Sequence, residues 1–325
     1  MEGHDHKFQR RLMGPAFNNQ SVRKLAPIFL QKAQQMCSKW DKLASEPSAS
    51  GTIEVARWIS RAVFDVIGLA GFDYNFDSLE DESEEVYKAY RGMFDAADNT
   101  PRVKGILGLY FPFIRTILPD DATRVTNAST RIIKKAGAKL VEAKKASVVG
   151  EMSKDEYESR QKDILSILIR ANLSADPSKR FTDAELLDQC STFLLAGSDT
   201  VAVAMTWCLH CLSLDAVLQT RLRDEIMSVA GTAPAFEDCD SIESLPLLDA
   251  VVRETLRLCP PVHSTIRVAV ADDQIPVSHP VVLQDGTTVE KGGFIKIRKG
   301  SYIHIPIEGL NLSTEIWGPD ALKFK

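Results

Sequence analysis

Apolar residues recur with the period of amphipathic helices over most of the first 260 positions. This spacing predicts helices over residues 20–43, 53–69, 80–97 and 122–146, separated by clusters of Pro, Gly, Ser or Asp. A capping box, Thr182-Asp-Ala-Glu185, begins the longest predicted helix, whose apolar stripe continues to Leu214. A shorter helix then ends at Pro260-Pro261. The first four fifths of the chain is therefore predicted to be helical.

Beyond Pro261, β-branched residues alternate with polar ones around two hairpin-type turn signals, Asp285-Gly286 and Lys299-Gly300. Residues 101–120 are apolar but punctuated by Pro and Gly, which predicts a connection lying on the core or on a bilayer surface. Residues 148–160 are polar and predict a loop, followed by a turn at the ILSILIR stretch. With no internal repeat, the pattern predicts a single mainly α domain over residues 1–325, helical over 1–260 and β-rich over 262–310.

Composition narrows the class of protein. The 325 residues are 44% hydrophobic and 26% charged, with a net charge of −5, so nucleic acid is not expected as a partner. The N-terminus lacks the apolar run of a signal peptide. Residues 192–214 carry one formal charge, Asp199; a carboxylate at the centre of a membrane span costs about 2.5–3.5 kcal/mol, so we expect a buried core helix. The six scattered cysteines predict reduced core residues, and Cys208-x-x-Cys211 predicts packing rather than a metal site.

Polar residues interrupt the longest helix at Gly197-Ser-Asp-Thr200. One interpretation is a helix break, with Asp199 capping a second helix. In the other, the helix continues, because its apolar stripe keeps its phase, and Gly197, Asp199 and Thr200 face a cavity or a ligand. A threonine inside a helix can bond the carbonyl four residues earlier, and a glycine lets a large group approach the backbone. The second interpretation suits a groove over a flat cofactor.

Two further pairs are ambiguous when each is taken alone. Glu254 and Arg257 lie three apart on one helical face, and their apolar neighbours favour a buried ion pair over a solvated one. His6 and Arg10 lie one helical turn apart, where they either grip carboxylates of one ligand or form a solvated basic edge.

Together these motifs, in this order, resemble the cytochrome P450 family of haem-thiolate monooxygenases over essentially the whole chain. The HKFQRRLMGPAF wording is similar to that of fungal microsomal members, and WGPDALKF is similar to the segment that precedes the family's haem loop. The resemblance implies haem b as cofactor and insertion of one oxygen atom of O2 into a small apolar substrate. It also implies electrons from an NADPH-dependent reductase and, for an intact member, the endoplasmic reticulum membrane. This chain alone, without an anchor, is expected in the cytoplasm.

Residue by residue, the resemblance implies five roles. Asp199 and Thr200 match the acid–alcohol pair that relays protons, and Ala196 and Gly197 match the groove where oxygen binds. The positions that match ligands of the haem propionates are His6, Arg10 and Arg267. Glu254 and Arg257 match the structural ion pair, and Val262 and Ile266 match positions that contact substrate.

The iron ligand is the main departure from the family pattern. The Phe-x-x-Gly-x-Arg-x-Cys-x-Gly loop is absent from the 325 residues, and none of the six cysteines has its context, so no metal ligand is predicted. The family's anchor, first helices and most of its N-terminal sheet are expected before Met1. Two interpretations follow: part of a monooxygenase that is inactive alone, or a non-catalytic α-helical remnant that at most binds a ligand weakly.

Overall fold

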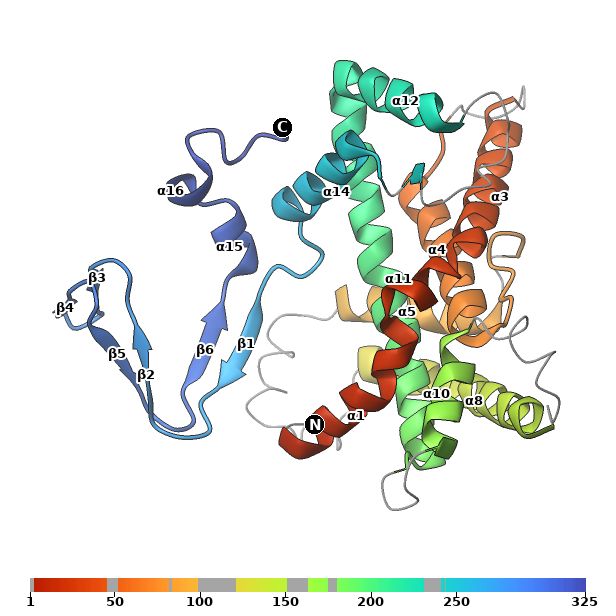
Figure 1. Cartoon of the computed structure of the whole chain (residues 1–325), viewed down its shortest axis with the longest axis horizontal. Coiled ribbons are helices and arrows are strands. Elements are labelled where there is room, and N and C mark those ends of the chain that lie inside the picture. The colour runs from red at the N-terminus through yellow and green to blue at the C-terminus, as the bar shows by residue number, and fades with distance from the viewer. Residues whose placement is uncertain are drawn as a thin grey trace.

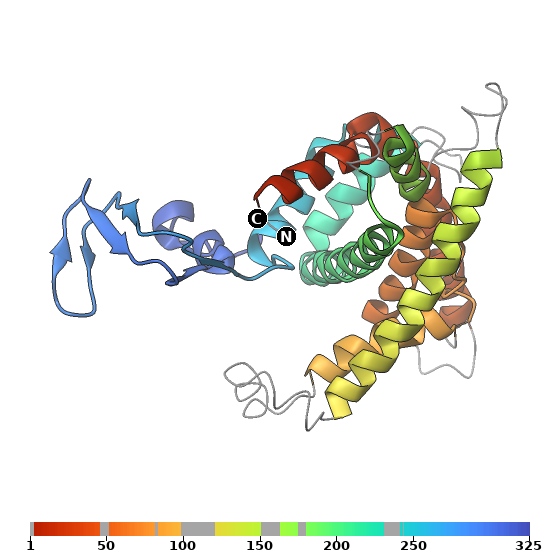
Figure 2. The same cartoon turned by 90° about the horizontal axis from the view of Figure 1, so that it is seen from below.

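The computed structural model of the chain describes residues 3–45, 52–81, 84–98, 121–150, 163–174, 180–230, 241–242 and 244–325. Helices α1 to α14 gather into one body, and the strands with the short helices α15 and α16 form an extension that projects from it (Figures 1 and 2). The predicted mainly α fold with a small β region is confirmed. The helical elements are α1 (Gly3–Met13), the 3-10 helix η1 (Gly14–Phe17), α2 (Asn19–Arg23), α3 (Ala26–Ser45), α4 (Val55–Phe72), α5 (Glu85–Asp98), α8 (Asp121–Gly150), α10 (Ile164–Ser174), α11 (Asp183–Leu214), α12 (Ala216–Ala230), α14 (Pro246–Leu258), α15 (Ile307–Asn311) and α16 (Thr314–Trp317).

Helix α11 is the axis of the helical body (Figure 1). Its capping box forms as predicted, since the Thr182 hydroxyl accepts from the Glu185 N–H at 3.2 Å and the Glu185 carboxylate accepts from the Thr182 N–H at 2.8 Å. The helix runs unbroken to Leu214 through the Gly-Ser-Asp-Thr segment. The interpretation of that segment as a helix break is therefore wrong.

The largest core lies where α11 meets α4, α5, α8 and α10. Phe64 of α4 packs against Tyr90 of α5 with ring centroids 5.0 Å apart, and Leu186 and Leu194 of α11 are buried in the same cluster. Burial of this apolar set, at about 25 cal/mol per Å², is the main force holding the five helices together.

A buried ion pair joins α3 to α4. Lys32 donates to the Asp65 carboxylate at 3.1 Å and to Asn75, while the Ser78 and Leu79 N–H groups donate to the same carboxylate. These bonds satisfy an otherwise costly buried charge. They also hold the segment after α4 against the helices.

Several predicted boundaries differ from the structure. The helix expected over 20–43 is divided into α2 and α3, because Pro27 has no N–H to donate and its ring excludes the helical position of the Arg23 carbonyl. The ILSILIR stretch, expected as a turn, is helix α10, whose first turn is capped by the Asp163 carboxylate accepting from the Ser166 N–H. Helix α8 extends to Gly150, beyond the expected start of the loop at 148; the rest of that loop and the connection at 101–120 lie outside the described residues.

The β extension consists of three two-stranded antiparallel sheets, the last of which forms the hairpin at its tip (Figure 2). Strand β1 (Thr265–Val268) pairs with β6 (Tyr302–Ile305), and β2 (Asp273–Pro276) pairs with β5 (Phe294–Ile297). The tip pairs β3 (Val281–Val282) with β4 (Thr288–Val289) around the predicted turn, with Gly286 at φ 83°. A hairpin turn was also expected at Lys299-Gly300, but β5 and β6 on either side of it pair with different strands. Gly300, at φ 84°, instead lies between the β2–β5 pair and the β1–β6 pair.

Burial of α11 is incomplete. Among the described residues, α11 is the one helix long and apolar enough to cross a membrane, and 17% of its most apolar 18-residue window is buried. One face packs into the core, whereas Val201, Met205 and Trp207 are exposed. The expectation of a buried core helix therefore holds for one face of α11 only.

Candidate functional site

The candidate site lies on α11 between Ala196 and Thr200. The Thr200 hydroxyl donates to the Ala196 carbonyl at 2.7 Å, and the Ser198 hydroxyl donates to the Leu194 carbonyl at 2.6 Å. Each hydroxyl is thus satisfied by the carbonyl four residues earlier, which explains how the segment stays helical. Ser198 is buried toward the core, whereas Thr200 is half-buried and Ala196 is exposed.

Gly197 permits a close approach, but by a neighbouring helix. A Cβ atom at this position would lie 2.9 Å from Cδ1 of Ile67, a half-buried residue of α4. The missing side chain therefore lets α4 and α11 pack closely behind the site. The surface available to a ligand is formed by the exposed Ala196 and the half-buried Thr200.

Asp199 lies beside a buried tyrosine that the sequence analysis did not identify. Tyr90 of α5 is fully buried, and burial together with the negative charge of Asp199 raises the pKa of its phenol. The helical spacing of Val86, Tyr87 and Tyr90 marks a buried face of α5. Nothing in that spacing identifies α11 as the partner, so the neighbour of Asp199 is found only in the structure.

Glu254 and Arg257 form a buried, bidentate ion pair on α14. Two Arg257 nitrogens donate to the two Glu254 oxygens at 2.7 Å, and the side chains are 5% and 12% exposed for Arg257 and Glu254. The remaining Arg257 donors bond the carbonyls of Asn311, Ala321 and Lys323, at 2.8, 2.7 and 3.1 Å. Hydrogen bonding to Arg257 lowers the pKa of Glu254. The pair thus holds α14 to the C-terminal segment.

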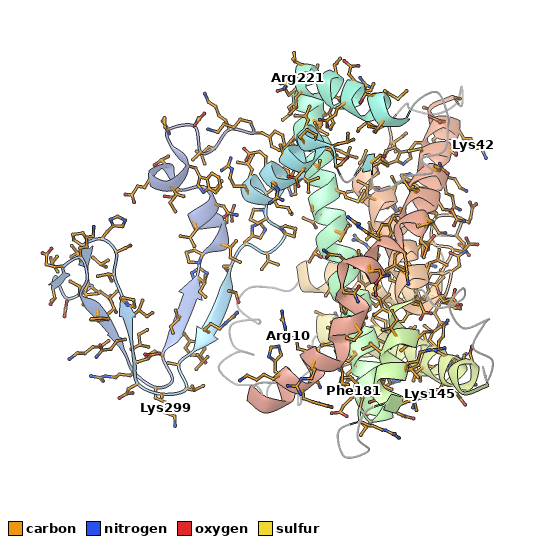
Figure 3. The ribbon with its side chains drawn as sticks, in the orientation of Figure 1. Arg10, Lys42, Lys145, Phe181, Arg221 and Lys299 are labelled. Carbon is orange, nitrogen blue, oxygen red and sulfur yellow. The ribbon has the colours of Figure 1, made fainter. Side chains whose placement is uncertain are left out.

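The predicted propionate ligands lie on two elements, helix α1 and strand β1. His6 and Arg10 are exposed on α1, and Figure 3 shows Arg10 extending from that helix on the side away from α10. Arg267 is exposed on β1, where it donates to the Thr265 hydroxyl at 2.7 Å and to the Ile266 carbonyl at 3.0 Å. The two apolar positions assigned to substrate, Val262 and Ile266, are exposed on the same stretch of chain.

Two of the described cysteines, Cys37 and Cys190, have thiols with raised pKa values. Burial raises the pKa of Cys190 to about 12, because it lies in the main core. Cys37 lies on α3 and is exposed as a residue. Its thiol is partly buried, and this burial, with a smaller contribution from the negative charge of Asp41, raises its pKa. Cys239 lies outside the described residues, and no group of three possible ligands gathers elsewhere in the described ranges.

The described residues fit one part of a haem site, the helix surface and the cations, but not the iron ligand. Ala196 and Thr200 give α11 a small, half-open surface that a flat group can approach, and the exposed cations Arg10 and Arg267 are of the type that binds carboxylates. A thiolate that would hold the haem iron would need a lowered pKa, and the raised pKa values of Cys37 and Cys190 do not fit that role.

Comparisons with known proteins agree with this geometry. The sequence model of the cytochrome P450 family matches residues 1–325. The chain is 39% identical to cytochrome P450 monooxygenase 205 of Postia placenta and 34% identical to cytochrome P450 monooxygenase claP of Ampulloclitocybe clavipes, over 100% and 99% of its length. It spans 60% and 59% of those relatives.

One solved structure supports the fold independently. The crystal structure of a cytochrome P450 superposes with a TM-score of 0.75 at 23% identity, covering 100% of this chain and 65% of that one. At that identity the likeness bears on the fold alone. Together with the match over its full length, this shows that the chain belongs to the cytochrome P450 family.

Proposed function

We propose that this chain forms the oxygen-binding side of a haem-dependent monooxygenase, which inserts one atom of O2 into an apolar organic substrate. The observation that carries the proposal is the placement of Asp199 and Thr200 within an unbroken helix, next to the exposed Ala196. The relatives' names support the reaction class, since they are cytochrome P450 monooxygenases.

Haem b fits the proposal as the cofactor, with His6, Arg10 and Arg267 as ligands of its propionates. When bound, haem supplies the redox chemistry that activates O2. Oxygen insertion consumes two protons per turnover, so the protein has to deliver protons while keeping bulk water out.

The contacts of Thr200 suit it to hold water at this position. Its hydroxyl proton is engaged by the Ala196 carbonyl at 2.7 Å, so its oxygen lone pairs remain to accept a hydrogen bond from water. The half-buried Asp199 carboxylate next to it can take a proton from solvent and release it. The pair then orients water and moves protons, while the hydroxyl of Tyr90 packs behind them.

Partner and location follow from the same proposal. An NADPH-dependent reductase supplies the electrons, and the intact protein resides at the endoplasmic reticulum membrane. The substrate is a small apolar molecule that contacts Val262 and Ile266, whose exposed aliphatic side chains suit such a ligand. Taken by itself, the 325-residue chain does not catalyse oxygenation, because the ligand-loop cysteine is not in its sequence.

Thr200→Ala in the complete haem enzyme tests the relay. We expect it to uncouple electron use from product formation, with more peroxide released per NADPH oxidised. Thr206→Ala is the matched control, because Thr206 makes the same bond, to the Ala202 carbonyl at 2.8 Å, less than two turns away. Equal coupling in the two variants would refute the role of Thr200.

A further inference from the structure

A small cavity in the main core has no part in the proposed function. It lies where α4, α5, α8 and α11 meet, and the centre of a water-sized sphere can move within about 10 Å³ of it. Six of the residues that line it are Phe72, Phe76, Ile133, Ala136, Cys190 and Leu194. Ala136 is half-buried, and the other five are at most 4% exposed. The cavity is therefore lined mainly by core side chains.

Small residues on α8 leave this space. A Cβ atom at Gly137 would lie 2.7 Å from Cδ1 of Leu187, so the missing side chain lets α8 approach α11 closely. The neighbouring Ala136 contributes only a methyl group to the cavity. On the side of α4, the Phe76 ring packs against that of Phe64 with centroids 4.7 Å apart, which keeps it from moving into the space. The cavity therefore persists within the packed core.

The lining does not suit water. Among the described lining residues, only Cys190 and Ser191 carry a polar side-chain atom. The Ser191 hydroxyl already donates to the Leu187 carbonyl at 3.0 Å. Burial raises the pKa of Cys190 to about 12, so its thiol stays protonated and is a weak hydrogen-bond donor. A buried water makes about two to four hydrogen bonds, whereas an apolar cavity stays dry and takes apolar guests such as xenon. A cavity of this size has room for one molecule about as large as water, which excludes larger organic molecules.

We propose that this cavity binds one small apolar molecule of the size of O2. The inference rests in part on the proposed function, because O2 is the molecule of this class which that function consumes. Leu194 connects the cavity to the candidate site, since its side chain lines the cavity and its carbonyl accepts the Ser198 hydroxyl at 2.6 Å. Dispersion contacts with the lining hold the guest on the core side of α11, within one helical turn of the Gly-Ser-Asp-Thr segment.

Methyl NMR of the 325-residue chain without haem tests the site, with xenon as the probe. The Ile, Leu and Val methyl groups are labelled, and spectra are recorded as the xenon pressure is raised. We expect shifts that saturate at Ile133 and Leu194, which line the cavity. Leu222 and Val251 are buried in a separate core cluster and should show no saturable shift. O2 is paramagnetic, and it should broaden the methyl signals of the cavity lining more than those of the separate cluster.

Substitutions on α8 test the assignment to this cavity, with the Leu194 methyl groups as the reporter. Ala136→Leu fills the space and should abolish the saturable shift. Ala138→Leu makes the same change at an exposed position of the same helix and should leave the shift intact. Ile133→Val is a conservative core change that enlarges the cavity, so its shift should saturate at a lower xenon pressure.

The proposal is overturned if the xenon shifts are absent or rise linearly in both sets of residues, if a folded Ala136→Leu retains the shift, or if O2 broadens both sets equally. Should Ala136→Leu not fold, Ile133→Val decides, because an unchanged saturation pressure would place the guest elsewhere. Failure of the proposed function is seen separately, as equal coupling in Thr200→Ala and Thr206→Ala, and leaves the xenon result unchanged.

Discussion

Replacing Arg257 with alanine removes the centre of the contact between α14 and the C-terminal segment. The side chain makes two hydrogen bonds to Glu254 and three to backbone carbonyls, and its guanidinium lies 5.0 Å from the Trp317 ring centroid. The variant leaves a largely buried carboxylate and three carbonyls without these donors. Breaking a buried pair from one side costs about 3–5 kcal/mol. We expect a loss of that size, localised to the contact between α14 and residues 307–325.

The same helix provides a matched control. Arg253 donates to Asp249 at 2.7 Å, but the two side chains are 77% and 54% exposed. Solvent-exposed helix pairs of this kind contribute about 0.3–0.5 kcal/mol. Arg253→Ala should therefore leave the C-terminal segment almost unchanged, although it removes the same residue type from the preceding turn.

Hydrogen exchange followed by mass spectrometry measures both variants. At about 1.4 kcal/mol per factor of ten, Arg257→Ala should speed exchange in residues 307–325 by about a hundredfold to a few thousandfold, or until protection is lost. Trp317 fluorescence should change in parallel. The reasoning fails if Arg257→Ala and Arg253→Ala give the same exchange in this segment, or if Arg257→Ala destabilises α4 and α5 equally.

Three further predictions concern the packing, the ion pair and the relay. Gly68→Ala should lower the free energy of unfolding in urea by about 1–3 kcal/mol, because the new Cβ would lie 2.5 Å from the Phe76 ring. Gly71→Ala is the control and should leave the free energy of unfolding unchanged, because the nearest atom to its new Cβ is 3.9 Å away. The pKa of Glu254 is lowered in the folded state. The Glu254 carboxylate therefore stabilises the fold at pH values above its ordinary pKa of 4.5, and this stabilisation is lost as the pH falls through the folded-state pKa. Acid titration of Trp317 fluorescence should show the loss, and a flat response would contradict it. Thr200→Ala should raise peroxide release in the complete enzyme, as argued above.

The sequence predicts those elements whose signals are local. The capping box at Thr182 gives the start of α11, and the unbroken phase of the apolar stripe indicates that Gly-Ser-Asp-Thr stays helical. The sequence also contains the signal for the division between α2 and α3, because Pro27 cannot continue a helix from Arg23. The apolar period runs across this break and predicts one continuous helix instead.

Contacts between distant segments could not be predicted from periodicity. Tyr90 lies about a hundred positions before Asp199, and the period of α5 shows only that this tyrosine is buried. Gly197 could accommodate either a cofactor or a helix, and the packing of α4 through Ile67 decides between them.

The carbon monoxide spectrum of the haem-loaded, reduced protein tests the central claim most directly. The 325-residue chain is reconstituted with haem, reduced and exposed to carbon monoxide, and the monooxygenase relative of Postia placenta is treated in the same way as a control. We predict a thiolate-type Soret shift for the control and none for the 325-residue chain. A thiolate-type shift in the 325-residue chain would contradict the account.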